Sequence, residues 1–507
     1  MINSMKLLFR FIVASVTLTA ITGYVYFSDG GRYKADLEAY LSEISGYKIG
    51  INGEIEWLIL PALGLSAQNI RATDASEDIS IGKLTLNAHI DNIFAALESW
   101  QIHRFVLEDV KVESEGSKMI LSKLILTDFS PDTASPFVAD LAYVRANPEA
   151  SRDNFNLNGL LTFTALERSN SDHRIRVRFA DTVLKSAYAT GICSGEVTDN
   201  IGLGDPIGDD DNALLPVDSI LAFNAEFNCE LNKIDADGFA LENGNLTFGQ
   251  TEGKGEMSLS FDDFFGGKFQ TTASVNANLV PIAWDISLNG SDIDSRKLFA
   301  LTESKLKWQA PLSVEGNFKM LGNTEKTLTQ SVIGSANFNG GQGSINVSQF
   351  KKAIILVNQL VNADKPVAEL PDQLQYNNLT VAWTIQGEAN TLVVALDNLK
   401  AKASGSIQFL TGNLSLSGEA LIHTPKPGQQ IRLTPILLDT AIPFNCEGKL
   451  DEPACKPNTK AVGKMLIQIL KNSQQGKVKE KLDKVIEEQV PEQFKDAAKQ
   501  LLNLFGR

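Results

Sequence analysis

Apolar and polar residues alternate along most of the chain between residues 50 and 450, and this is the period of strands with one apolar face and one wet face. Two segments are especially regular at every second position: Leu157, Leu161 and Phe163 in the first, and Ile175, Val177 and Phe179 in the second. In the second segment the intervening residues are Arg174, Arg176 and Arg178, which are too polar to share the apolar face. The pattern therefore predicts a one-sided sheet.

Shorter stretches repeat the same alternation: 79–90, 257–261, 380–385 and 414–416. Turn-forming residues separate many of them: Asn-Gly at 52–53, Glu-Asn-Gly-Asn at 242–245, Asn-Gly-Gly at 339–341 and Thr-Gly-Asn at 411–413. Short strands joined by tight turns predict an antiparallel meander. The fold class is therefore mainly β, with one long antiparallel sheet.

Helical periodicity is confined to three places, about 32–45, about 348–363 and the tail from about 459. In the tail, apolar residues recur at helical spacing on both sides of Pro491, which predicts amphipathic C-terminal helices. These helices either dock on their own β body or meet a partner or membrane surface, and the pattern leaves both readings open.

An uncharged run of 18 residues, 11–28, lies near the N-terminus and follows Lys6 and Arg10. A helix of this length is about 27 Å long, close to the thickness of the bilayer's hydrocarbon core. A cleaved signal peptide is the alternative, although its apolar region is usually shorter and ends in a small-residue cleavage site. We expect a retained anchor, with residues 1–10 in the cytoplasm and the bulk of the chain across the membrane.

The chain has four cysteines, and that placement would put them in an oxidising compartment. Cys446 and Cys455 are nine residues apart across a turn, a separation that a hairpin can close. Cys193 and Cys229 would then pair by elimination. Four buried free thiols remain the alternative.

Composition and charge narrow the function further. Lys and Arg total 46 against 61 Asp and Glu, a net charge of −15, which disfavours a nucleic-acid partner. The four histidines do not fall at metal-ligand spacing from one another or from a cysteine, and none of the common hydrolase, nucleotide-binding or metalloprotease motifs occurs. The acidic stretch 204–213 lacks the pattern of a calcium loop. We therefore expect no enzyme, metal or cofactor.

The segment GYKIGINGEIEWLILPALGLSAQNI at 46–70, which follows the predicted anchor and helix, resembles the opening of the AsmA-like family. The matching positions are Gly53, Ile55, Trp57, Pro61, Gly64 and Leu65. Three later segments resemble, in order, the family's strand leading to a short helix, its Gly-rich hairpin running into a helix, and its closing strands: 284–299, 332–357 and 442–458.

This resemblance implies an inner-membrane, single-pass periplasmic protein related to bridge-like lipid-transfer proteins, whose curved sheet forms an apolar groove. The expected regions are a cytoplasmic start, an anchor, an N-terminal helix and β region, a β-groove body and the C-terminal helices: 1–10, 11–28, 29–130, 131–458 and 459–507. The expected function is phospholipid transport in outer-membrane biogenesis, with acyl chains bound by the six apolar residues named first. An assembly factor for outer-membrane proteins, acting without lipid transfer, is the alternative.

Overall fold

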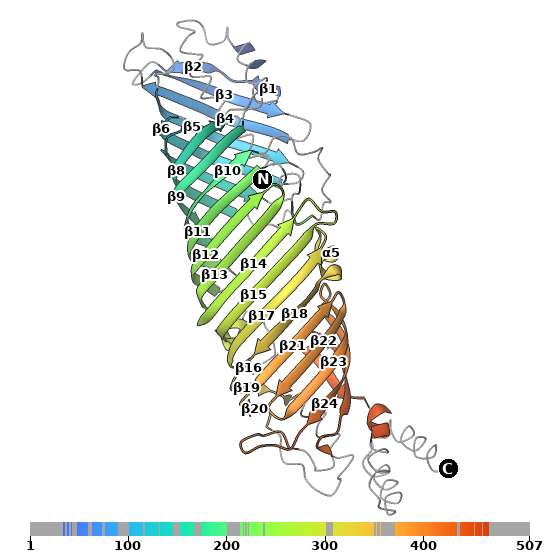
Figure 1. Ribbon diagram of the computed structural model, residues 1–507. Coiled ribbons are helices and arrows are strands. Elements are labelled where there is room, and N and C mark those ends of the chain that lie inside the picture. The colour runs from blue at the N-terminus through green and yellow to red at the C-terminus, as the bar shows by residue number, and fades with distance from the viewer. Residues whose placement is uncertain are drawn as a thin grey trace, which may run out of the picture. The chain divides into compact units, whose positions relative to one another are not determined.

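The computed structural model describes residues 48–465 with internal gaps, together with five positions between Lys34 and Ser42. The longest gaps are 90–100, 200–222 and 349–370, and the last two contain isolated described positions. The described strands form one long antiparallel sheet and a second sheet of three strands (Figure 1). The chain divides into two compact units, residues 1–261 with 274–279, and residues 262–273 with 280–507.

In the first unit, each strand from β3 to β12 pairs antiparallel with its neighbours in chain order, which is the predicted meander (Figure 1). β1 and β2 both pair with β3. The strands are β1 Lys48–Ile51, β2 Ile55–Leu58, β3 Leu63–Thr73, β4 Glu77–His89, β5 Gln101–Ser114, β6 Ser117–Phe129, β7 Ser135–Val144, β8 Asp153–Leu166, β9 Arg174–Ser186, β10 Ala189–Asp199, β11 Phe223–Ala236, β12 Phe239–Thr251 and β13 Lys254–Phe264.

The alternation slips by one residue at the same level of four neighbouring strands. On β4 the buried residues are Ile79 and Ile81 before Gly82, and Leu84 and Leu86 after it. The corresponding slips occur at Asn69 on β3, Asp109 on β5 and Ser122 on β6. Asn69 and Asp109 have left-handed φ values of 51° and 53°, a conformation that Asn and Asp tolerate better than most residues. The slips are aligned across the sheet, so the apolar residues stay on one face.

Gly82 is required at this level by close packing, because a Cβ there would lie 2.8 Å from the Cβ of Asp109. The inward side chains of these strands form the core of the unit. Phe105 and Leu107 are fully buried in it, with 0% exposure. A closed apolar core therefore covers the inner face of the first strands.

The second unit continues in the same antiparallel manner from β15 through β17, β18 and β21 to β26. β13 and β14 Gly267–Asn276 are each divided between the two units. The other elements of the second unit are β15 Ala283–Asp294, α4 Ser295–Ala300, β16 Trp308–Gln309, β17 Pro311–Leu321, α5 Glu325–Ser331, β18 Ile333–Asn339, β19 Gly343–Asn346, β20 Gln373–Tyr376, β21 Leu379–Gln386, β22 Ala389–Leu396, β23 Leu399–Gln408, β24 Asn413–Ile422, β25 Ile442–Lys449 and β26 Glu452–Pro457. A strand leading to a short helix, expected at 284–299, is confirmed by β15 and α4.

The three-stranded sheet of β16, β19 and β20 contributes buried residues to the core of the second unit. Trp308 Nε1–H donates a hydrogen bond to the hydroxyl of Tyr376, and both side chains are buried. Burial raises the pKa of Tyr376 above its usual value. The small sheet is thus fixed by a polar contact inside an apolar core.

Two sequence predictions about turns are wrong. The Glu-Asn-Gly-Asn segment at 242–245 lies inside β12, where Asn243 adopts a φ of 56° and the strand continues. A Gly-rich hairpin was expected within 332–357, but β18 pairs in the long sheet and β19 in the small one. The chain therefore passes from the long sheet to the small sheet between β18 and β19, because these two strands pair with different neighbours.

The expected helices are described only in part. Positions within 34–42, 348–355 and 460–465 are helical. Among the residues that the structure describes, no helix has the length and apolar character needed to cross a bilayer. The expected anchor at 11–28, the acidic stretch 204–212 and the tail beyond residue 465 lie outside the described residues.

Candidate functional site

We call the side of the sheet that carries the core of the first unit its inner side. On this side, β8 to β12 carry rows of apolar side chains that run across the strands. The antiparallel register brings Leu161 opposite Phe179, and Phe163 opposite Val177. Residues directly opposite each other in an antiparallel pair point to the same face. We call this surface the apolar face; it comprises Leu157, Leu161, Phe163, Val177, Phe179, Leu184, Cys193, Val197, Ala225, Phe227, Cys229, Leu231, Leu246 and Phe248.

The rows continue from β9 through β10 to β12. Phe179 lies opposite Gly195, which lies opposite Phe227, and Phe227 in turn lies opposite Phe248. The rings of Phe227 and Phe248 stack with centroids 4.7 Å apart. A Cβ at Gly195 would lie 2.6 Å from the Cβ of Phe227, so the close approach of β10 and β11 requires glycine there. The result is a surface of aromatic and aliphatic side chains that is lower at β10, where Gly195 has no side chain.

The opposite side of the same strands is polar. Arg178 lies opposite Thr162 on one side and Glu196 on the other, and its Nη2 lies 3.0 Å from Glu196 Oε2. Arg176 also approaches Glu196, at 3.9 Å. Two of the three arginines that suggested a one-sided sheet thus have side chains on the outer side, as expected. The Arg174 side chain lies outside the described residues.

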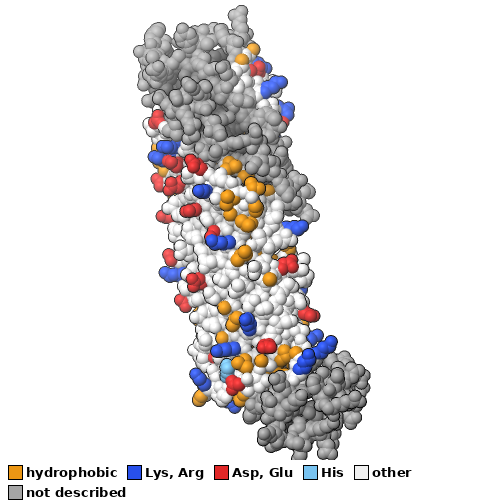
Figure 2. Space-filling view, turned by 45° about the vertical axis from the view of Figure 1, so that its right-hand side comes forward, with side chains coloured by type: hydrophobic (Ala, Val, Ile, Leu, Met, Phe, Trp, Pro, Cys, Tyr) orange, Lys and Arg blue, Asp and Glu red, His pale blue; other side chains and the backbone are white. Residues whose placement is uncertain are grey.

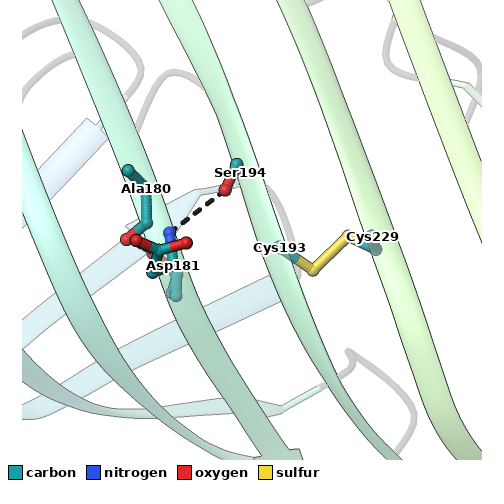
Figure 3. Close-up of a disulfide and its surroundings, with 6 residues drawn as sticks. Ala180, Asp181, Cys193, Ser194 and Cys229 are labelled. Carbon is teal, nitrogen blue, oxygen red and sulfur yellow. Dashed lines mark hydrogen bonds between the residues drawn. A yellow bond between two sulfur atoms is a disulfide. The ribbon is translucent and has the colours of Figure 1, made fainter.

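A phase slip like that of the first strands also crosses this site. Asp181 on β9 has a φ of 47°, and its N–H donates to Ser194 Oγ on β10 at 3.1 Å (Figure 3). After this bulge the inward residues of β9 become Thr182 and Leu184. Gly159 of β8 lies beside the bulge, where a Cβ would come within 2.7 Å of Thr182. The bulge therefore keeps the apolar residues of β8 and β9 on one face.

The two predicted disulfides are present. Cys193 and Cys229 face each other across β10 and β11 with an S–S distance of 2.13 Å, and they lie on the apolar face (Figure 3). Cys446 and Cys455 join β25 to β26 in the second unit, at 2.01 Å. Their Cα–Cα distances of 4.1 and 4.0 Å suit antiparallel pairs in which the two residues do not exchange backbone hydrogen bonds. Each disulfide cross-links neighbouring strands.

Burial changes along the sheet. Phe163 is 5% exposed and belongs to the core of the first unit, so it contributes to the packing of that core and not to the exposed part of the apolar face. Leu157, Leu161 and Val177 are partly buried and pack against that core. Phe179, Phe227, Leu246 and Phe248 are also only partly buried. Ile175 lies on β9, but its side chain is outside the described residues.

Apart from Cys229, which was predicted as a disulfide partner, the residues of β11 and β12 on this face were not among the sequence predictions. A signal existed for them, since Phe223, Ala225, Phe227, Cys229 and Leu231 alternate without interruption. Of these five residues only Phe227 is partly exposed, and the other four are buried; a partly exposed apolar side chain retains contact area for a ligand. Figure 2 shows hydrophobic side chains gathered among polar ones on the face in view.

The chemistry of the apolar face is limited to burying apolar groups. Its side chains offer few hydrogen-bonding groups, and the described residues contain no cluster of three or more His, Cys, Asp or Glu side chains arranged to hold a metal ion. Away from this face, near the β3–β4 connection, the hydrogen bond from Arg71 lowers the pKa of the Asp78 carboxyl. A surface of this composition can bury the hydrocarbon groups of a ligand.

The second unit has its own one-sided apolar surface. Phe318, Trp383, Leu392 and Phe444 lie on the inner side of β17, β21, β22 and β25, and all are partly buried. Trp383 Nε1–H donates to Asn390 Oδ1 at 2.8 Å, which satisfies the polar atom of the ring. The same surface chemistry thus occurs in each unit.

Comparison of the chain with protein-family models, with curated proteins and with solved structures finds no match in any of the three.

Proposed function

We propose that the protein binds the acyl chains of envelope phospholipids on its apolar face and carries lipid between membranes, contributing to outer-membrane biogenesis. The observation that carries this proposal is the partly exposed row of Leu161, Phe179, Phe227 and Phe248, which begins beside the core of the first unit at Leu161. The opposite side of the same strands carries the ion pair of Arg178 and Glu196. A surface of this kind in water must be covered by something apolar. An acyl chain suits it, because it needs no hydrogen-bonding partners.

The order of motifs similar to the AsmA-like family supports the same proposal. In that reading the run 11–28 anchors the chain in the inner membrane and the two units lie in the periplasm. The two disulfides agree with an oxidising compartment.

The alternative is an assembly factor that captures partner strands at a sheet edge. Within the described residues, β26 pairs only with β25 and forms such an edge. Asn458 N–H donates to Pro443 O at 2.9 Å, so alternate N–H groups of β26 point toward β25 and those of residues 453, 455 and 457 would point outward. Two of these three residues are proline, which has no N–H to donate. This edge is poorly suited to strand addition, and we prefer the lipid proposal.

The test is site-specific photo-crosslinking in cells, with a photoreactive amino acid at Phe179 or Phe227 and at the neighbouring outer-face positions Arg178 or Glu226. Adducts should contain phospholipid at the two inner positions and none at the outer ones. Mass spectrometry of the adducts identifies the lipid. Protein-only adducts at Phe179 and Phe227 would favour the assembly factor, and an absence of adducts at both would contradict a lipid-binding face.

A further inference from the structure

One row of inward side chains runs across the first unit from β3 to β12. On β3 to β8 the register places each residue opposite the next, in the order Leu65, Leu86, Phe105, Leu126, Phe137 and Gly159. Gly159 lies beside Thr182 on β9, and from there the row continues through Cys193, Cys229 and Leu246. The core of the unit and the apolar face therefore belong to one row.

The exposed fraction of the side chains changes at β8. Leu86, Phe105 and Leu126 are 0% exposed and pack together in the core. Where the core meets β8, the rings of Phe129 and Phe163 are in edge-to-face contact, with centroids 5.4 Å apart. Beyond that contact, the partly exposed apolar side chains include Leu161, Phe179, Leu184, Phe227, Leu246 and Phe248. The inner side is thus filled as far as β8 and retains uncovered apolar area after it.

The size of the side chains changes at the same place. After β7 the row has the small residues Gly159 and Thr182, and on β10 the three successive inward positions are Gly191, Cys193 and Gly195. A protein interior is close-packed only where side chains supply the volume. The small side chains therefore leave space above β10, whereas the large ones of β4 to β7 fill the interior.

We call the space above these three β10 residues the β10 trough. Phe179 and Leu184 on β9 form one wall, and Phe227 and Leu231 on β11 form the other. The two wall strands are about 10 Å apart, twice the spacing between neighbouring strands. The hydroxyl of Thr182 in the β9 wall donates to a backbone oxygen of its own strand. A trough of this width, lined by apolar side chains, suits one extended hydrocarbon chain.

We propose that the lipid site of the first unit ends at β8: a single acyl chain lies in the β10 trough, and lipid enters and leaves across β9 to β12 without passing over β3 to β7. This inference rests on the proposed function and defines which part of the inner side takes part in it. A chain that continued over β4 to β6 would displace Leu86, Phe105 and Leu126, and their close-packed core has no space to receive it. The first unit therefore holds lipid as a carrier does and does not conduct it along all of its strands.

Photo-leucine tests this boundary, because it replaces leucine with a diazirine of similar shape and reports on many positions of the full chain at once. Cells that make the full chain with partial photo-leucine are irradiated, and mass spectrometry of the purified protein assigns lipid adducts to residues. We expect adducts at the partly exposed leucines of the inner side, Leu161, Leu184 and Leu246. Their yield should be at least about tenfold higher than at the fully buried leucines, which lipid reaches only when the core opens: Leu86, Leu107 and Leu126.

The matched control is Leu160, which neighbours Leu161 on β8 but faces the outer side, and it should carry no lipid. Lipid adducts at the three buried leucines in a yield similar to that at Leu161 would overturn the boundary at β8 and leave the proposed function standing. Equal adducts at Leu160 and Leu161 would overturn the assignment of the trough. An absence of lipid at all of these inner leucines, with protein cross-links at the buried ones to show that the diazirine reacted, would contradict the proposed function itself.

Discussion

Val177→Asp tests the apolar face most directly, because it places a charge in the row without altering the outer side. Val177 lies between Phe163 on β8 and Val197 on β10, and it packs against the closed core. The side chain is only partly buried, so losing its apolar contacts should cost about 1 kcal/mol. Placing a carboxylate among apolar neighbours without a hydrogen-bond donor adds about 1 to 3 kcal/mol. We therefore expect a loss of about 2 to 4 kcal/mol in the free energy of unfolding.

The matched control is Thr162→Asp, which adds the same charge to the outer side of the same pair of strands, opposite Arg178. A surface substitution of this kind should change stability by less than about 0.5 kcal/mol. Urea unfolding measures both variants, and lipid extracted from the purified proteins is quantified by mass spectrometry. Val177→Asp should lose most of the bound lipid, whereas Thr162→Asp should keep it.

Two results would refute this reasoning. A stability loss below about 0.5 kcal/mol for Val177→Asp would mean that water already solvates this position, so it is not part of an apolar surface. Equal lipid content in the two variants would mean that the lipid, where present, lies elsewhere. Either result would leave the strand pairing unchanged but would remove the proposal that the apolar face binds lipid.

The remaining predictions concern the cross-links and the second unit. Non-reducing peptide mapping should recover Cys193 joined to Cys229 and Cys446 joined to Cys455, whereas alkylation of all four without reductant would contradict both pairs. From the entropy of loop closure, Cys193→Ala/Cys229→Ala should lower the free energy of unfolding by about 4 kcal/mol, because its cysteines are 36 residues apart. Cys446→Ala/Cys455→Ala, with a separation of 9 residues, should lower it by about 2.5 kcal/mol. Denaturant unfolding that reversed this order would show that loop closure does not dominate. Tyr376→Phe leaves the buried Trp308 Nε1–H without its acceptor and should cost about 1 to 3 kcal/mol near neutral pH. Because burial raises the pKa of Tyr376, the contribution of this tyrosine to the free energy of unfolding is complete below the ordinary tyrosine pKa and is lost as pH rises through the folded-state pKa. The Tyr376→Phe variant should therefore lose less stability than the original chain as the pH is raised. Equal losses in the two proteins would argue against this coupling.

The sequence by itself determined the class of fold and the one-sidedness of the sheet. Period-two alternation is a local property, since each residue's face is set by its immediate neighbours along a strand. Strands were therefore predictable at 174–179 and at 257–261, as was the separation of Val177 from Arg178. The spacing of Cys446 and Cys455 likewise suffices to suggest a hairpin.

The tertiary structure alone decided what depends on the neighbouring strand. A slip in alternation at Asn69 or Asp181 reads in sequence as a break, and only pairing shows a bulge that returns the apolar residues to the same face. Asn-Gly at 243–244 resembles a turn for the same reason, yet it lies within β12. The hydrogen bonds from the backbone N–H groups of Ile49 and Ile51 to Ser42 Oγ and Glu38 Oε1 join residues 7 and 13 positions apart, and no local pattern encodes them. Hydrogen bonds between strands and across edges fix these features, because their energies depend on partners distant in sequence.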